Sequence, residues 1–169
     1  VTKGSLTGPF NYQYIPSARG ARWTVAKVAM LNGDDAPDIV AASDKVPDID
    51  FFGDLAAGGA EATIPTDGPV KFLDVADFDG DVVSDVVFGE THAGTNVIDV
   101  AYAYGRAFGP PETPVVVGRI SGVTAISPFG KAPADAAIFT QENPGPGETL
   151  PATALALLLG SGDRQPLAP

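Results

Sequence analysis

Short runs in which apolar and polar residues alternate, separated by turn residues, recur along the whole chain. The stretches 10–15 and 23–30 alternate with period two, and others, such as 155–159, are continuously apolar. No long stretch carries apolar residues at helical spacing, so the pattern predicts an all-β protein of short antiparallel strands. Twelve strands are predicted, at residues 10–15, 23–30, 39–42, 48–53, 61–64, 70–76, 86–88, 97–104, 113–117, 122–126, 136–139 and 154–159.

The turns between these strands repeat with a regular spacing. A turn glycine followed five residues later by an aspartate occurs three times, with successive copies 47 and 50 residues apart: Gly33 with Asp38, Gly80 with Asp85, and Gly130 with Asp135. A period near 50 residues with four short strands per unit is typical of the blades of a β-propeller. We therefore expect a single domain over residues 1–169, with repeat units at about 22–69, 70–119 and 120–169.

Composition and charge narrow the classes of function. The 169 residues include no Cys, which excludes a disulfide scaffold, a thiolate metal site and a cysteine nucleophile. The formal net charge of −11 argues against nucleic acid or an anionic membrane as the main partner and suits a protein that takes up cations. No apolar run is long enough for a transmembrane helix, so membrane insertion is not expected. The first residues lack the pattern of a signal peptide, which an exported protein would have lost in its mature form.

One loop carries the strongest candidate chemistry. Asp77, Asp79, Asp81 and Asp85 occupy alternate positions of a nine-residue stretch, and Val83 fills the one alternate position that lacks an aspartate. Four carboxylates so close together repel one another unless a positive charge lies between them. A hard divalent cation is the natural candidate, and Ca²⁺ tolerates this number of oxygen ligands and an irregular geometry better than Mg²⁺ does. The alternative is a solvated acidic turn that only closes a hairpin.

This loop resembles the motif of the FG-GAP/VCBS repeats of integrin-α-type β-propellers, Asp-x-Asn/Asp-Gly-Asp-Gly-x-x-Asp followed by aliphatic residues. Residues 77–87 match the motif closely, residues 30–40 match it with Met30 in place of the first aspartate, and the third copy, at 127–135, matches it weakly. Residues 108–110 also resemble the Phe-Gly turn at the start of the last strand of such repeats. The resemblance, which spans about residues 24–165, implies blades of four antiparallel strands.

The resemblance also implies two sets of calcium ligands. In the second unit the ligands would be the carbonyl of Val83 and the side chains of Asp77, Asp79, Asp81 and Asp85. In the first unit a weaker site would use the carbonyl of Ala36 and the side chains of Asn32, Asp34 and Asp38. Val82 stands where the family prefers Gly, at a position that often needs a positive φ.

The number of units raises the question of how a ring would close. Three blades cannot form a closed ring, for which about four to eight are typical. We expect a homodimer of six blades, in which residues 8–16 of each chain supply the ring-closing strand that the third unit of the other chain lacks. The alternative is that the chain is a fragment of a larger propeller.

Three classes of function remain open. The resemblance implies a calcium-stabilised, non-enzymatic module that binds a protein or a glycan in adhesion or lectin-like recognition, at an extracellular, cell-surface or periplasmic location. A polysaccharide lyase or hydrolase would need a cluster of acids, His or Tyr outside the repeat loops. The sequence reveals no such cluster, so no catalytic residue is assigned, and His92 is expected to be a surface residue. The third class is a purely structural assembly unit.

Overall fold

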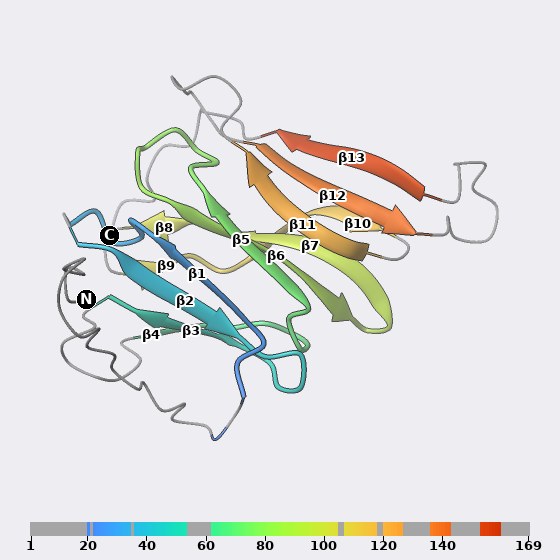
Figure 1. Cartoon of the computed structure of the whole chain (residues 1–169), viewed down its shortest axis with the longest axis horizontal. Helices are drawn as coiled ribbons and strands as arrows, with labels where there is room; N and C mark the ends of the chain where they lie inside the picture. The colour runs from blue at the N-terminus through green and yellow to red at the C-terminus, as the bar shows by residue number, and fades with distance from the viewer. Residues whose placement is uncertain are drawn as a thin grey trace, which may run out of the picture.

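Antiparallel sheets account for all the regular structure of the described residues. The structure is a computed structural model that describes Gly20 and residues 22–34, 36–53, 62–104, 107–117, 120–126, 136–142 and 153–159. These ranges contain strands and no helix, which confirms the predicted all-β class (Figure 1). Within them, no helix of the length and apolar character of a membrane span is present. The predicted ring-closing strand at 8–16 and the third loop at 127–135 lie outside the described residues.

The first sheet is a four-stranded meander. Its strands pair in chain order: β1 (Val25–Ala29), β2 (Asp38–Ala42), β3 (Ile49–Phe52) and β4 (Ala62–Ile64). The side chains of β1 alternate between half-buried and exposed, as the period-two pattern predicts for a strand with one covered face. Nearly all residues of β2 and β3 are buried, because these two strands lie in the middle of the sheet.

Two further sheets follow along the chain. The second has the order β10-β7-β6-β5 and consists of β5 (Phe72–Ala76), β6 (Asp85–His92), β7 (Thr95–Ala101) and β10 (Glu112–Val117). The third has the order β11-β12-β13 and consists of β11 (Ile120–Ile126), β12 (Ala136–Glu142) and β13 (Thr153–Leu159). A small hairpin of β8 (Ala103–Tyr104) and β9 (Ala107–Phe108), which the pattern did not predict, precedes β10.

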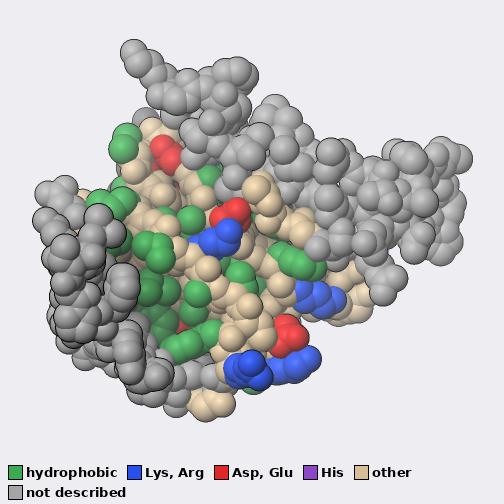
Figure 2. Space-filling model, in the orientation of Figure 1, with side chains coloured by type: hydrophobic (Ala, Val, Ile, Leu, Met, Phe, Trp, Pro, Cys, Tyr) green, Lys and Arg blue, Asp and Glu red, His purple; other side chains and the backbone are tan. Residues whose placement is uncertain are grey.

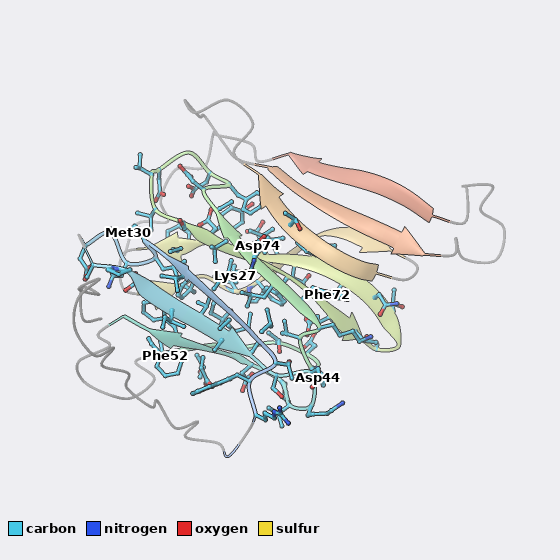
Figure 3. All side chains as sticks on the ribbon, viewed as in Figure 1. Lys27, Met30, Asp44, Phe52, Phe72 and Asp74 are labelled. Atoms are coloured by element: carbon cyan, nitrogen blue, oxygen red, sulfur yellow. The ribbon has the colours of Figure 1, made fainter. Side chains whose placement is uncertain are left out.

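The first strands of the three sheets lie next to one another. β5 contacts β1 on one side and β11 on the other, and the three run through the middle of the view in Figure 1. Lys27 of β1 and Asp74 of β5 form an ion pair at 3.0 Å that joins the first two sheets. Figure 3 labels both residues, and Figure 2 shows a basic and an acidic side chain in contact at the same place on the surface.

Apolar side chains cover both faces of the second sheet. One core lies between the first and second sheets and consists of Leu31, Val40, Ala42, Ile49, Phe51, Ile64, Val70, Leu73, Val86, Phe88 and Ala101. The other lies on the opposite face, where Val123 of β11 packs against Ala76, Phe78, Val87, Ile98 and Val100. Burial on both faces explains why the residues after Asp85 in β6, Val86–Phe88, form a continuous apolar run instead of an alternating one.

Candidate metal centre

The aspartate loop connects β5 to β6 in the second sheet. Its path depends on two residues with left-handed backbone, Gly80 with φ of 83° and Val82 with φ of 75°. The motif position of Val82, which often needs a positive φ, has one here, so a β-branched side chain occupies a conformation that favours glycine. Val82 is 86% exposed, so its side chain contributes little packing in return.

The loop brings three of its four carboxylates together. Asp77, Asp79 and Asp85 each offer an oxygen that lies within 4.8 Å of the other two. Asp79 and Asp85 are buried and Asp77 is half-buried, whereas Asp81 is exposed and does not belong to this group. Oxygens at this spacing can surround one hard cation, and carboxylates are the ligands that Ca²⁺ prefers.

Main-chain amides hold these carboxylates in place. The two oxygens of Asp77 accept hydrogen bonds from the amides of Gly80, Asp81 and Val82, at 2.6, 3.1 and 2.9 Å. Asp85 accepts one from Phe78 at 2.8 Å and one from Ala103 at 2.9 Å. A carboxylate offers about four acceptor sites, so capacity for a cation remains after these bonds are made.

The electrostatics of the loop oppose its full ionisation without a cation. Burial and the charges of Asp79 and Asp81, opposed by the hydrogen bonds from Ala103 and Phe78, together raise the pKa of Asp85 to about 7. The pKa of Asp79 is also raised, first by burial and then by the charges of Asp81 and Asp77. A bound cation would reverse the balance, because it would favour the charged form of each carboxylate.

The corresponding loop of the first sheet closes through its own hydrogen bonds. Asn32 donates its amide to Asp34 at 2.9 Å and accepts from the Asp34 main-chain amide at 2.9 Å. The amide of Ala36 donates to Asp34 at 2.8 Å, and Asp38 accepts from the amides of Leu31 and Asn32. The described residues of this loop include two carboxylates, Asp34 and Asp38, and in the described part of the chain the only group of three close ligand residues lies in the second loop.

The two loops lie side by side. The amide of Ser84 donates to the carbonyl of Met30 at 2.8 Å, and a Cβ on Gly33 would lie 3.6 Å from the Val83 side chain. Met30, which replaces the first aspartate of the motif, is 39% exposed and brings no carboxylate to its loop. The first loop therefore supports the second by contact, with less charge of its own to neutralise.

A second group of acids, which the sequence analysis did not find, lies outside the loops. Glu90 and Asp99 are buried on adjacent strands, and Asp67 pairs with His92 at 2.8 Å beside them. His92 is exposed, as predicted, yet it lines the same cavity as these acids. The sequence did contain a signal for this group, because Glu90 and Asp99 each lie within an otherwise apolar strand, at Val86–Glu90 and Val97–Ala101. Buried strand positions rarely carry an unpaired charge.

The fold and the loop define an all-β protein of antiparallel sheets with an acidic candidate cation site. Compared with models of known protein families and with curated proteins, the chain matches none.

Proposed function

We propose that this chain is a calcium-stabilised, non-enzymatic binding module of the FG-GAP/VCBS β-propeller type. The observation that carries the proposal is the convergence of Asp77, Asp79 and Asp85 within 4.8 Å in the loop between the first two strands of a sheet. Two meanders of four strands, a third sheet of three, and the adjacency of β1, β5 and β11 support an arrangement of blades around a common axis.

In this proposal calcium has a structural role. It holds the β5–β6 loop and neutralises carboxylates that otherwise oppose folding. A ligand that binds only the folded state at 100 times its dissociation constant stabilises by about 2.7 kcal/mol. For a chain of this size that corresponds to a rise in Tm of roughly 5–10 °C.

A paired measurement in calcium and in chelator tests the metal site. Wild-type protein should melt at a higher temperature in Ca²⁺ than in EGTA, and Asp79→Asn should lose that difference. In EGTA the variant should be at least as stable as wild type, because one repelling charge is gone while the amide oxygen can still accept from Asp81. Asp44→Asn, which removes an exposed carboxylate elsewhere, is the control. Equal melting temperatures of wild type in Ca²⁺ and EGTA would refute the calcium site.

The assembly follows from the number of sheets. Three blades leave open edges, so we propose that two chains close a six-bladed ring that presents a binding surface for a protein or a glycan. The proposal includes an extracellular, cell-surface or periplasmic location, where calcium is available to weak sites. Light scattering in Ca²⁺ should give the mass of a dimer, and a folded, stable monomer would contradict the ring.

A further inference from the structure

A cavity of about 290 Å³ opens where the connection from β4 to β5 passes β6 and β7, at the end of β6 away from the aspartate loop. It is lined by Pro65, Thr66, Asp67, Glu90, His92, Asp99 and Pro111. Five residues of extended strand separate Asp85 from Glu90, which is roughly 17 Å. The cavity is therefore a separate feature from the candidate calcium site.

Two buried carboxyl groups form its floor. Glu90 and Asp99 are 3% and 2% exposed. Glu90 lies opposite Val97 and Phe88 lies opposite Asp99 in the β6–β7 register, so the two acids occupy the same face as diagonal neighbours. They share a hydrogen bond, and Glu90 also accepts from the main-chain amide of Gly68 at 2.7 Å.

One oxygen of this pair lacks a partner. Asp99 Oδ1 is buried and makes no hydrogen bond with the residues that the structure describes. A buried acceptor left unsatisfied costs about 1–3 kcal/mol. Asp99 lines the cavity although Oδ1 itself is covered, so a small shift of this carboxyl group would let a donor on a bound molecule supply the missing hydrogen bond.

The residues that line the cavity favour a positively charged donor. Three acids and one histidine line the cavity, the histidine is paired with Asp67, and none of the described lining residues is Lys or Arg. Burial raises the pKa of Glu90 to about 7, which shows that a negative charge at this place lacks compensation. A cationic donor would provide both the hydrogen bond and the countercharge.

The geometry disfavours a metal ion and a sugar. Although three acids and a histidine line the cavity, no three of their ligand atoms lie within 4.8 Å of one another among the described residues, so they do not converge on a metal ion. The part of the lining that the structure describes contains no Phe, Tyr or Trp on which a sugar ring could stack. The hydrogen-bonded Glu90–Asp99 pair is also closer than the roughly 5 Å or more that separates the two carboxyl groups of a glycosidase.

We propose that this cavity binds a guanidinium or primary ammonium group carried on an aliphatic stem. Asp99 Oδ1 and Glu90 accept from the cationic head, and the rings of Pro65 and Pro111 contact the methylene groups of the stem. The source is either a free small molecule or an arginine or lysine side chain of a partner protein. The inference rests on the proposed binding function and specifies the ligand chemistry of that module.

Isothermal titration with two probes tests the proposal and distinguishes the sources. Agmatine represents a free guanidinium ligand, and N-acetyl-arginine amide represents a side chain on a peptide. The neutral N-acetyl-citrulline amide has nearly the same shape without the charge. We expect saturable binding of agmatine, of the blocked arginine or of both, none of the citrulline, and a loss of at least roughly 10-fold in affinity in Asp99→Asn. The exposed Asp44→Asn variant should bind as wild type does.

Each outcome has a definite meaning. Binding of agmatine alone supports a free ligand, and binding of the blocked arginine supports a partner side chain. Absence of binding by both probes, or affinity unchanged in Asp99→Asn, overturns the proposal, as does a site here that takes Ca²⁺ or a monosaccharide instead. Should Asp99→Asn fail to fold, Asp67→Asn at the exposed rim should weaken binding by a smaller factor. Titrations in both Ca²⁺ and EGTA separate this result from the calcium test, because cation binding with no calcium effect on Tm refutes only the calcium loop.

Discussion

Replacing Val82 by glycine should stabilise the protein. Val82 has φ of 75° and is 86% exposed, so the substitution removes a strained side chain that packs against little. Its amide donates to Asp77 at 2.9 Å, and glycine keeps that bond because it is made by the main chain. Strain in the loop can therefore be relieved without removing an interaction.

The expected change in folding stability is the sum of three contributions. A left-handed conformation costs a residue with a Cβ about 1–2 kcal/mol, and a β-branched residue lies at the upper end. Glycine gains flexibility in the unfolded chain, which costs the variant about 0.7 kcal/mol. Val82 is 86% exposed, so the one-seventh that is covered contributes about 0.3 kcal/mol out of about 2 kcal/mol for a fully buried valine. The net gain is about 1 kcal/mol, or a rise of roughly 2–4 °C in Tm.

Urea unfolding in EGTA measures this gain without a contribution from bound metal. Trp23 is the only tryptophan in the sequence, and its ring packs edge-on against Phe52, so its fluorescence reports unfolding of the first sheet. Val28→Gly is the matched control, since Val28 is 62% exposed on β1 and has no positive φ. It should lose about 1 kcal/mol. If Val82→Gly is destabilised as much as Val28→Gly, the strain argument is wrong.

Three further predictions concern the sheets. Burial raises the pKa of Glu90 from 4.5 to about 7. Its contribution to the stability of the fold is therefore present below pH 4.5 and is lost as the pH rises to about 7. Melts in EGTA across this range should show a smaller loss of stability for Glu90→Gln than for wild type. A double-mutant cycle of Lys27→Met and Asp74→Asn should give a coupling of about 0.5–1 kcal/mol, since the partly exposed Lys27 lies 3.0 Å from the buried Asp74. Additive effects of the two substitutions would contradict this prediction. Gly68→Ala should lose about 2–3 kcal/mol of folding stability, because the new Cβ would lie 2.5 Å from a backbone oxygen of β6. Gly94 has open space around it but φ of +85°, so Gly94→Ala should lose about 1 kcal/mol. Equal losses in the two variants would refute the steric reason.

Local pattern was sufficient for the strands and for the loop conformation. Alternation and short apolar runs predicted the strands of all three sheets, because period two depends only on the geometry of an extended chain. The aspartate motif marked the position of Val82 as one that often needs a positive φ, and the structure has φ of 75° there. The hairpin of β8 and β9 was not predicted, since strands of two residues are too short to show a period.

The candidate metal site was also predicted in part by the sequence and decided in part by the structure. Spacing placed Asp77, Asp79, Asp81 and Asp85 in one loop, but the path of the backbone decides that Asp81 points out of the group of three. Whether calcium occupies the group stays a prediction. Spacing alone treats the four aspartates alike, because it carries no information on which side chain is buried.

The sequence by itself determined that this chain forms short antiparallel strands with an acidic turn between them, because those properties depend on neighbouring residues. Only the tertiary structure decided that Glu90 and Asp99 share a buried cavity. Their meeting depends on the register of β6 and β7, and their burial depends on the connection from β4 to β5, whose Gly68 donates a hydrogen bond to Glu90. Desolvation makes their charges unfavourable, and it depends on what packs over them, so an acid in a strand becomes a candidate binding group only once the sheets are packed.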